Sequence, residues 1–66
     1  MCRNIRTLAN QDPPATDEDI QASVEQFVRK LSGRRKAPKG REDIFEDAVA
    51  DITSVTRRMI RQLETL

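Results

Sequence analysis

The sequence predicts an all-α protein, an antiparallel hairpin of two helices with a short packed segment at its N-terminus. Apolar side chains recur every three or four residues in two stretches, which is the spacing of one helix face. A run of ten residues, 32–41, rich in Gly, Arg and Lys separates the two stretches. Each stretch is acidic at its start and basic at its end, so antiparallel packing brings unlike charges together. We expect one domain over residues 1–66.

The first helix is expected over residues 17–31. Two prolines hold the backbone extended before it, and Thr16 with Asp19 three residues later approximates a capping box. Gly33 follows the last apolar position, where a left-handed residue commonly ends a helix. The predicted apolar stripe consists of Ile20, Val24, Phe27, Val28 and Leu31.

The second helix is expected over residues 42–64. Its stripe consists of Ile44, Phe45, Ala48, Val49, Ile52, Val55, Met59, Ile60 and Leu63. This helix is longer than the first, so part of its stripe overhangs and needs cover from Ile5 and Leu8 in the N-terminal segment 1–15. Their three-residue spacing favours a helical turn. The alternative is a strand over residues 3–9, as in a ribbon-helix-helix dimer, although the ten-residue loop is long for that motif.

Composition restricts how so short a chain can be stabilised. The apolar share is 36% with no Trp or Tyr, so the core must be aliphatic and thin. Cys2 is the single cysteine and there is no histidine, which excludes an internal disulfide and argues against a structural zinc site. Self-association or docking on a larger protein is the remaining route. With no apolar run long enough for a membrane and no signal-peptide pattern, a cytoplasmic location is expected.

The strongest local signal is a cluster of positive charge over residues 29–41. It contains seven basic residues and no acidic one: Arg29, Lys30, Arg34, Arg35, Lys36, Lys39 and Arg41. Such a cluster predicts contact with the phosphates of nucleic acid or with another polyanion. The simpler interpretation is a solvated loop, and the lack of an interleaved aromatic residue that could stack on bases favours it.

Other candidate groups carry weaker signals. Removal of Met1 would leave Cys2 at the N-terminus beside Arg3, and a nearby cation favours the reactive thiolate. A lone cysteine is more often an inert small hydrophobe, and without histidine it lacks the usual base partner. The acids Glu42, Asp43, Glu46 and Asp47 are explained by the positive end of a helix dipole rather than by a metal site. We therefore expect no catalytic residue, metal or cofactor, and no enzyme activity.

Three segments of the chain resemble a known family of short bacterial proteins. These are residues 1–8 (MCRNIRTL), residues 13–16 (PPAT) and residues 27–33 (FVRKLSG). They resemble the family catalogued as domain of unknown function 2277, over nearly the whole chain. The resemblance implies a compact helical protein and supplies no activity, cofactor or partner. The chain departs from the family pattern at Gln11, Arg34 and the basic stretch 35–41, which leaves residues 2–4 as the more family-like element.

The sequence leaves three interpretations of function open. The leading one is a non-enzymatic binding or accessory module whose basic loop contacts nucleic acid or another polyanion. The second is a structural or regulatory protein that forms a homodimer or docks on a larger protein through the exposed part of the second stripe. The third is a thiol-dependent redox or metal role for Cys2. No membrane association and no small-molecule substrate is indicated.

Overall fold

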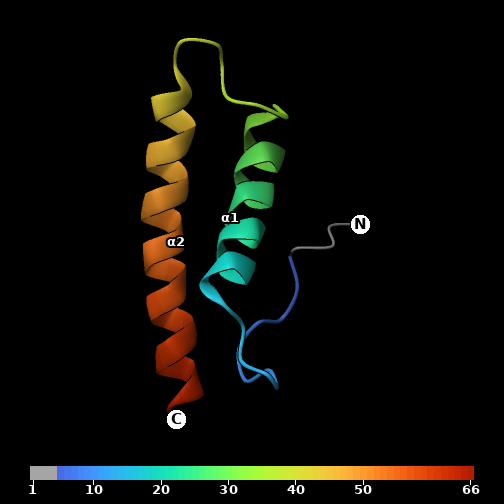
Figure 1. Ribbon diagram of the computed structural model, residues 1–66, viewed down its shortest axis with the longest axis vertical. Coiled ribbons are helices and arrows are strands. Elements are labelled where there is room, and N and C mark those ends of the chain that lie inside the picture. Colours follow the sequence, from blue (N-terminus) through green and yellow to red (C-terminus); the bar gives the residue numbers. More distant parts are fainter. Residues whose placement is uncertain (1–4) are drawn as a thin grey trace.

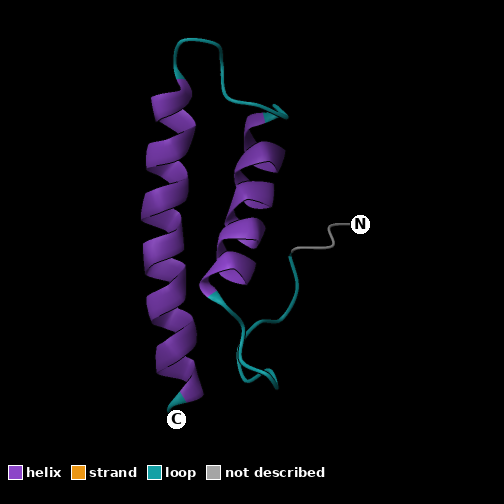
Figure 2. Cartoon of the chain, viewed as in Figure 1, coloured by secondary structure: helices purple, strands orange, loops and turns teal. Residues whose placement is uncertain are grey.

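Two antiparallel helices joined by one loop make up the protein in the computed structural model, which describes residues 5–66 (Figure 1). Helix α1 spans Asp17–Ser32 and helix α2 spans Glu42–Glu64. No strand occurs in residues 5–66, where everything outside the helices is loop or turn (Figure 2). The predicted all-α hairpin is therefore confirmed.

Both ends of α1 follow from local chemistry that the sequence contains. The backbone N–H of Asp19 donates to Thr16 Oγ1 at 3.1 Å, and Asp19 Oδ2 accepts from the backbone N–H of Thr16 at 2.9 Å. This reciprocal pair is the predicted capping box. At the other end Gly33 takes φ 72°, and its N–H donates to the carbonyl of Arg29 at 3.0 Å. The left-handed glycine thus ends the helix as predicted.

Helix α2 has 23 residues against 16 in α1, and it extends past the start of α1. It begins after a turn in which Gly40 has φ 81° and the N–H of Arg41 donates to the carbonyl of Pro38 at 2.9 Å. The N-terminal segment lies beside the far end of α2, opposite the loop (Figure 1). It supplies the expected cover for the overhang through Leu8, which is buried.

The conformation predicted for the N-terminal segment is wrong. Residues 5–16 form neither a helical turn nor, in the described part of residues 3–9, a strand. Asn10 turns the chain with φ 61°, and its N–H donates to Glu64 Oε2 at 3.0 Å. Arg61 Nη2 donates to the carbonyl of Ala15 at 2.6 Å. Contacts with α2, 46 and 54 residues away, hold this segment in place.

The core lies where the N-terminal segment, α1 and the second half of α2 meet. Its central residue is Ile20, which is 0% exposed. The buried hydrophobic residues are Leu8, Ala15, Ile20, Val24, Val28 and Ile60. Thr53 is buried as well, although it is polar.

Part of each predicted stripe is exposed rather than buried in the core. On α1, Phe27 is 42% and Leu31 is 71% exposed. On α2 the exposed stripe residues are Ile44, Val55, Met59 and Leu63. The reason is geometric: successive residues turn by about 100°, so the α2 stripe covers a wider arc than one neighbouring helix can contact.

Neither helix of the described chain is long and apolar enough to cross a membrane.

Candidate polyanion-binding site

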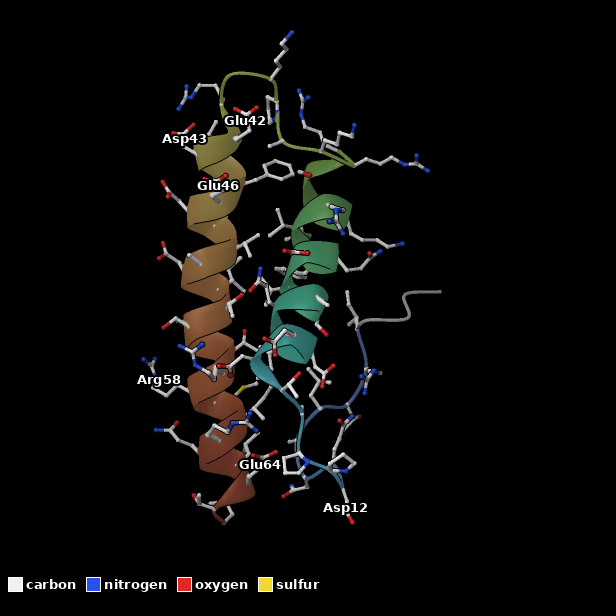
Figure 3. All side chains as sticks on the ribbon, viewed as in Figure 1. Asp12, Glu42, Asp43, Glu46, Arg58 and Glu64 are labelled. Carbon is white, nitrogen blue, oxygen red and sulfur yellow. The ribbon has the colours of Figure 1, made fainter. Side chains whose placement is uncertain are left out.

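The seven basic residues of the predicted cluster gather at the loop end of the hairpin, and we call this region the basic end. All seven are exposed: Arg29, Lys30, Arg34, Arg35, Lys36, Lys39 and Arg41. Long basic side chains project from the loop, and Glu42, Asp43 and Glu46 lie on the neighbouring first turns of α2 (Figure 3). The C-terminus lies at the opposite end of α2 (Figure 1).

Two of the seven cations are engaged by carboxylates. Arg29 Nη2 lies 3.7 Å from Glu25 Oε1, one turn earlier on α1, and Arg41 Nε lies 3.2 Å from Asp43 Oδ1. The other five make no ion pair within residues 5–66: Lys30, Arg34, Arg35, Lys36 and Lys39. These five charges remain open to an external anion.

Hydrogen bonds fold the first half of the loop back onto the last turn of α1. Arg29 Nε donates to the carbonyl of Arg35 at 3.2 Å. Ser32 Oγ donates to the carbonyl of Arg29 and accepts from the N–H of Arg34, both at 3.2 Å. Since these bonds tie the loop to the helix, the side chains on either side of the turn are held close together.

A shallow hollow of about 340 Å³ results at this turn. Its lining is Gln26, Arg29, Lys30, Gly33, Arg34 and Arg35. Four of the six are cationic and none is a carboxylate, so the hollow suits a phosphate group. Lys36, Lys39 and Arg41 do not line it, because they lie on the part of the loop that crosses to α2. The predicted cluster is therefore divided in two. Four of its residues line the hollow, and the other three flank it on the rest of the loop.

The helix dipoles contribute little to anion attraction here. The C-terminal end of α1 carries about half a negative charge, which four full positive side-chain charges outweigh. The N-terminal end of α2 has the opposite sign, but Glu42 and Asp43 already occupy its first turn. The side chains of the basic end, rather than the helix ends, thus set its potential.

A second hollow, of about 520 Å³, lies between the two helices and differs in character. Arg29, Arg35 and Arg57 line it, but so do the carboxylates of Glu25 and Glu46. Charges of both signs cancel much of the attraction for an anion. The hollow at the turn is the better anion site because its lining has a single sign.

Some predictions about individual residues are changed or left open by the structure. Arg61 contacts the carbonyl of Ala15 and the carboxylate of Glu64, although it was not among the predicted site residues. Gln26 in the hollow was not anticipated, since an uncharged residue among cations gives no signal of its own. Cys2 lies outside the described residues. Within residues 5–66 no group of three or more His, Cys, Asp or Glu side chains is placed to hold a metal ion.

Comparison with known proteins places the chain in a family without assigning it an activity. No curated protein and no solved structure is significantly similar to it. One family profile, described as "Uncharacterized conserved protein (DUF2277)", matches residues 1–66. Because the match covers the whole chain and agrees with the resemblance of its opening segment, the chain belongs to the DUF2277 family.

Proposed function

We propose that the protein is a non-enzymatic binding module whose basic end binds the phosphate backbone of nucleic acid. The observation that carries the proposal is the group of five exposed cations without ion-pair partners in residues 5–66, part of which surrounds a hollow free of carboxylates. Arginine and lysine on such a surface replace the counterions of phosphates, which is the usual source of affinity for nucleic acid.

The proposed contact is with the backbone rather than with the bases. No Phe, Tyr or Trp occurs in residues 29–41, so the basic end has no ring on which a base could stack. Contacts to phosphates position a protein but carry no sequence information. Binding should therefore be insensitive to base sequence and strongly sensitive to salt. With four to five phosphates neutralised, log K against log salt should fall with a slope of about −4 on duplex DNA.

Fluorescence anisotropy with labelled random RNA and duplex DNA over a salt series tests this proposal. The variant Arg34→Gln/Lys36→Gln removes two unpaired cations of the basic end. We expect weaker binding and a salt slope smaller by about 2, because each lost phosphate contact removes about one unit. The charge-preserving variant Arg34→Lys/Lys36→Arg should bind as the wild type does.

The matched control is Arg6→Gln/Arg57→Gln, which removes the same charge outside the basic end. It should keep most of the affinity and the slope. Equal losses in both double variants would show that overall charge, not this surface, drives binding. Absence of binding at low salt, or binding that salt leaves unchanged, would overturn the proposal. Competition with heparin and with inorganic polyphosphate determines whether nucleic acid is preferred over other polyanions.

A further inference from the structure

An apolar stripe runs along α2 at the edge of the face that packs on α1, and α1 leaves part of it exposed. It consists of Ala48, Ile52, Val55 and Met59, and we call it the α2 seam. Val55 is 54% and Met59 is 51% exposed. The spacing of four, three and four residues is that of the core positions of a coiled coil. A repeat of this kind is typical of a helix that packs along another helix.

A groove of about 450 Å³ continues from the seam. Ile52 and Met59 belong to both, and Ile5, Phe27 and Leu63 line the groove further on. The last three are between 42% and 48% exposed. Seam and groove therefore form one apolar surface to which the N-terminal segment, α1 and α2 all contribute.

This surface is large enough to bind a macromolecule. Its half-exposed large side chains offer roughly 500 Å² of apolar area, a size at which an exposed patch marks an interaction site. With a polar rim it approaches the ~800 Å² per partner of a standard interface. The isolated chain also has a small core: in residues 5–66, eight large hydrophobic side chains are exposed and five are buried. Burying this surface against a partner would add apolar contacts to the small core.

Two charges at the edge of the seam identify the occupant. Asp51 and Arg58 are seven residues apart, which puts them on the same side of α2 but about 10 Å apart along it. They are too distant to pair with each other, and neither has an ion pair in residues 5–66. Arg58 points away from α1 (Figure 3). If a second α2 lies antiparallel on the seam, Asp51 of each copy meets Arg58 of the other. In a parallel second copy these two edges would lie on opposite sides of the interface, so neither charge would meet its counterpart.

We propose that the α2 seam and its groove form the interface of a symmetric homodimer in which the two α2 helices pack antiparallel. A two-fold interface requires a surface that is complementary to itself. Here the apolar repeat packs on its own copy, and Asp51 and Arg58 form two equivalent ion pairs across the interface. The four helices of the two copies then form a bundle around a shared core. This inference is independent of nucleic-acid binding, because the basic end is not part of the interface.

Sedimentation velocity over micromolar to millimolar concentration tests the charge pairing. The wild type should sediment as a species of twice the 7.6 kDa chain mass. Asp51→Arg alone and Arg58→Asp alone each set like charges across the interface and should weaken self-association about tenfold. An equimolar mixture of the two variants should form a heterodimer, and the double variant Asp51→Arg/Arg58→Asp should self-associate as the wild type does.

Disulfide trapping tests the orientation, in a Cys2→Ser background. Antiparallel packing places Ala48 of one copy near Met59 of the other. A mixture of Ala48→Cys and Met59→Cys chains should therefore cross-link under mild oxidation, whereas neither variant should cross-link to itself. Efficient cross-linking of Ala48→Cys to itself would indicate parallel packing and overturn the proposal.

A matched pair of apolar-to-charged substitutions tests the location of the interface. Val55→Glu should give a monomer that keeps its helical circular dichroism. Leu31→Glu, at a residue that is 71% exposed and lines neither seam nor groove, should leave the dimer intact. A wild type that stays monomeric at millimolar concentration overturns the proposal. If such a monomer binds lipid vesicles, the surface is a membrane-contact face instead.

Discussion

Arg61 ties together parts of the chain that are far apart in sequence. Its Nη2 donates to the carbonyl of Ala15 at 2.6 Å, and its Nη1 lies 3.0 Å from Glu64 Oε1. Glu64 Oε2 in turn accepts from the N–H of Asn10 at 3.0 Å. The guanidinium has donors enough for both partners at once, which a lysine could not match with the same geometry. Arg61 and Glu64 therefore hold the N-terminal segment against the end of α2.

We predict that Arg61→Gln lowers the free energy of unfolding by about 1–3 kcal/mol, since hydrogen bonds from a charged donor are lost to a carbonyl and a carboxylate. Arg57→Gln, which removes the same charge four residues earlier on α2, should change it by less than about 0.5 kcal/mol. Urea titration followed by circular dichroism measures both. Equal effects of the two variants would mean that net charge, not the contact with Ala15, is responsible.

Two carboxylates make the stability depend on pH in acid. The pKa of Glu64 is lowered from its ordinary value of 4.5, chiefly by the hydrogen bond from Arg61 and then by that from Asn10. The pKa of Asp19 is lowered from 3.8, chiefly by the backbone N–H of Thr16. A carboxyl whose pKa is lower in the folded state stabilises that state above its unfolded pKa, and the contribution is lost as pH falls through the folded pKa.

We therefore expect the free energy of unfolding to be level near neutral pH and to decrease below the ordinary pKa values of the two groups. Urea titrations from pH 7 down to about 2 measure the decrease. Glu64→Gln should be less stable at pH 7 and show a shallower decrease in acid. If this variant kept the full acid dependence of the wild type, Glu64 would not contribute to it.

At the scale of the helices, Gly33 determines where α1 ends. Its φ of 72° is a conformation that residues with a Cβ rarely adopt, yet a Cβ at this position would meet no atom within 4 Å. We predict that Gly33→Ala is destabilising by about 1–2 kcal/mol through backbone strain alone. Gly33→Asn should cost less, because asparagine tolerates the left-handed region. Thermal unfolding followed by circular dichroism compares the wild type with the two variants. A Gly33→Ala variant as stable as the wild type would show that the left-handed conformation of Gly33 does not contribute to stability.

The two ends of α1 should respond differently to truncation. Ile20 is 0% exposed, and Ile20→Ala should cost about 2–5 kcal/mol, which is comparable with the whole stability of so small a core. We therefore predict that this variant is largely unfolded at 25 °C. Leu31→Ala should change stability by no more than about 0.5 kcal/mol. Far-ultraviolet circular dichroism gives the comparison, and a well-folded Ile20→Ala protein would show that the core lies elsewhere.

Local sequence predicted the elements of this fold well, because their signals lie within a few residues of one another. The capping box of Thr16 and Asp19 and the left-handed Gly33 are both local. The basic end could likewise be predicted, since its cations are neighbours along the chain. The hollow at the turn could not, because it depends on the bond from Arg29 to the carbonyl of Arg35.

Contacts between distant residues were not predictable in this way. Periodicity shows that α2 has a wide apolar arc but not which part of it α1 covers, so Val55 was expected in the core and Thr53 was not. The irregular N-terminal segment depends on Arg61 and Glu64, which are remote in sequence. A short apolar spacing such as that of Ile5 and Leu8 therefore predicted a helical turn that does not form.

At the scale of the whole molecule, the proposed dimer should link stability to concentration. When a dimer unfolds to separate chains, its free energy of unfolding rises by about 1.4 kcal/mol for each tenfold rise in protein concentration. For a dimer of this size we predict that Tm rises by about 5 °C per tenfold. Calorimetry at several concentrations measures the dependence. Val55→Glu should lack it, and a wild-type Tm that does not vary with concentration would speak against a dimer.

The long axis of the hairpin measures 42 Å, and the basic end occupies one pole of it. Antiparallel pairing would send the two basic poles outward in opposite directions. Two such poles are too far apart to clamp one short stretch of backbone together. Each basic end would bind a separate segment of nucleic acid, so one dimer would bridge two molecules. Long DNA would then be cross-linked into networks. Mixtures of the protein with long DNA should turn turbid, whereas mixtures with short oligonucleotides should stay clear.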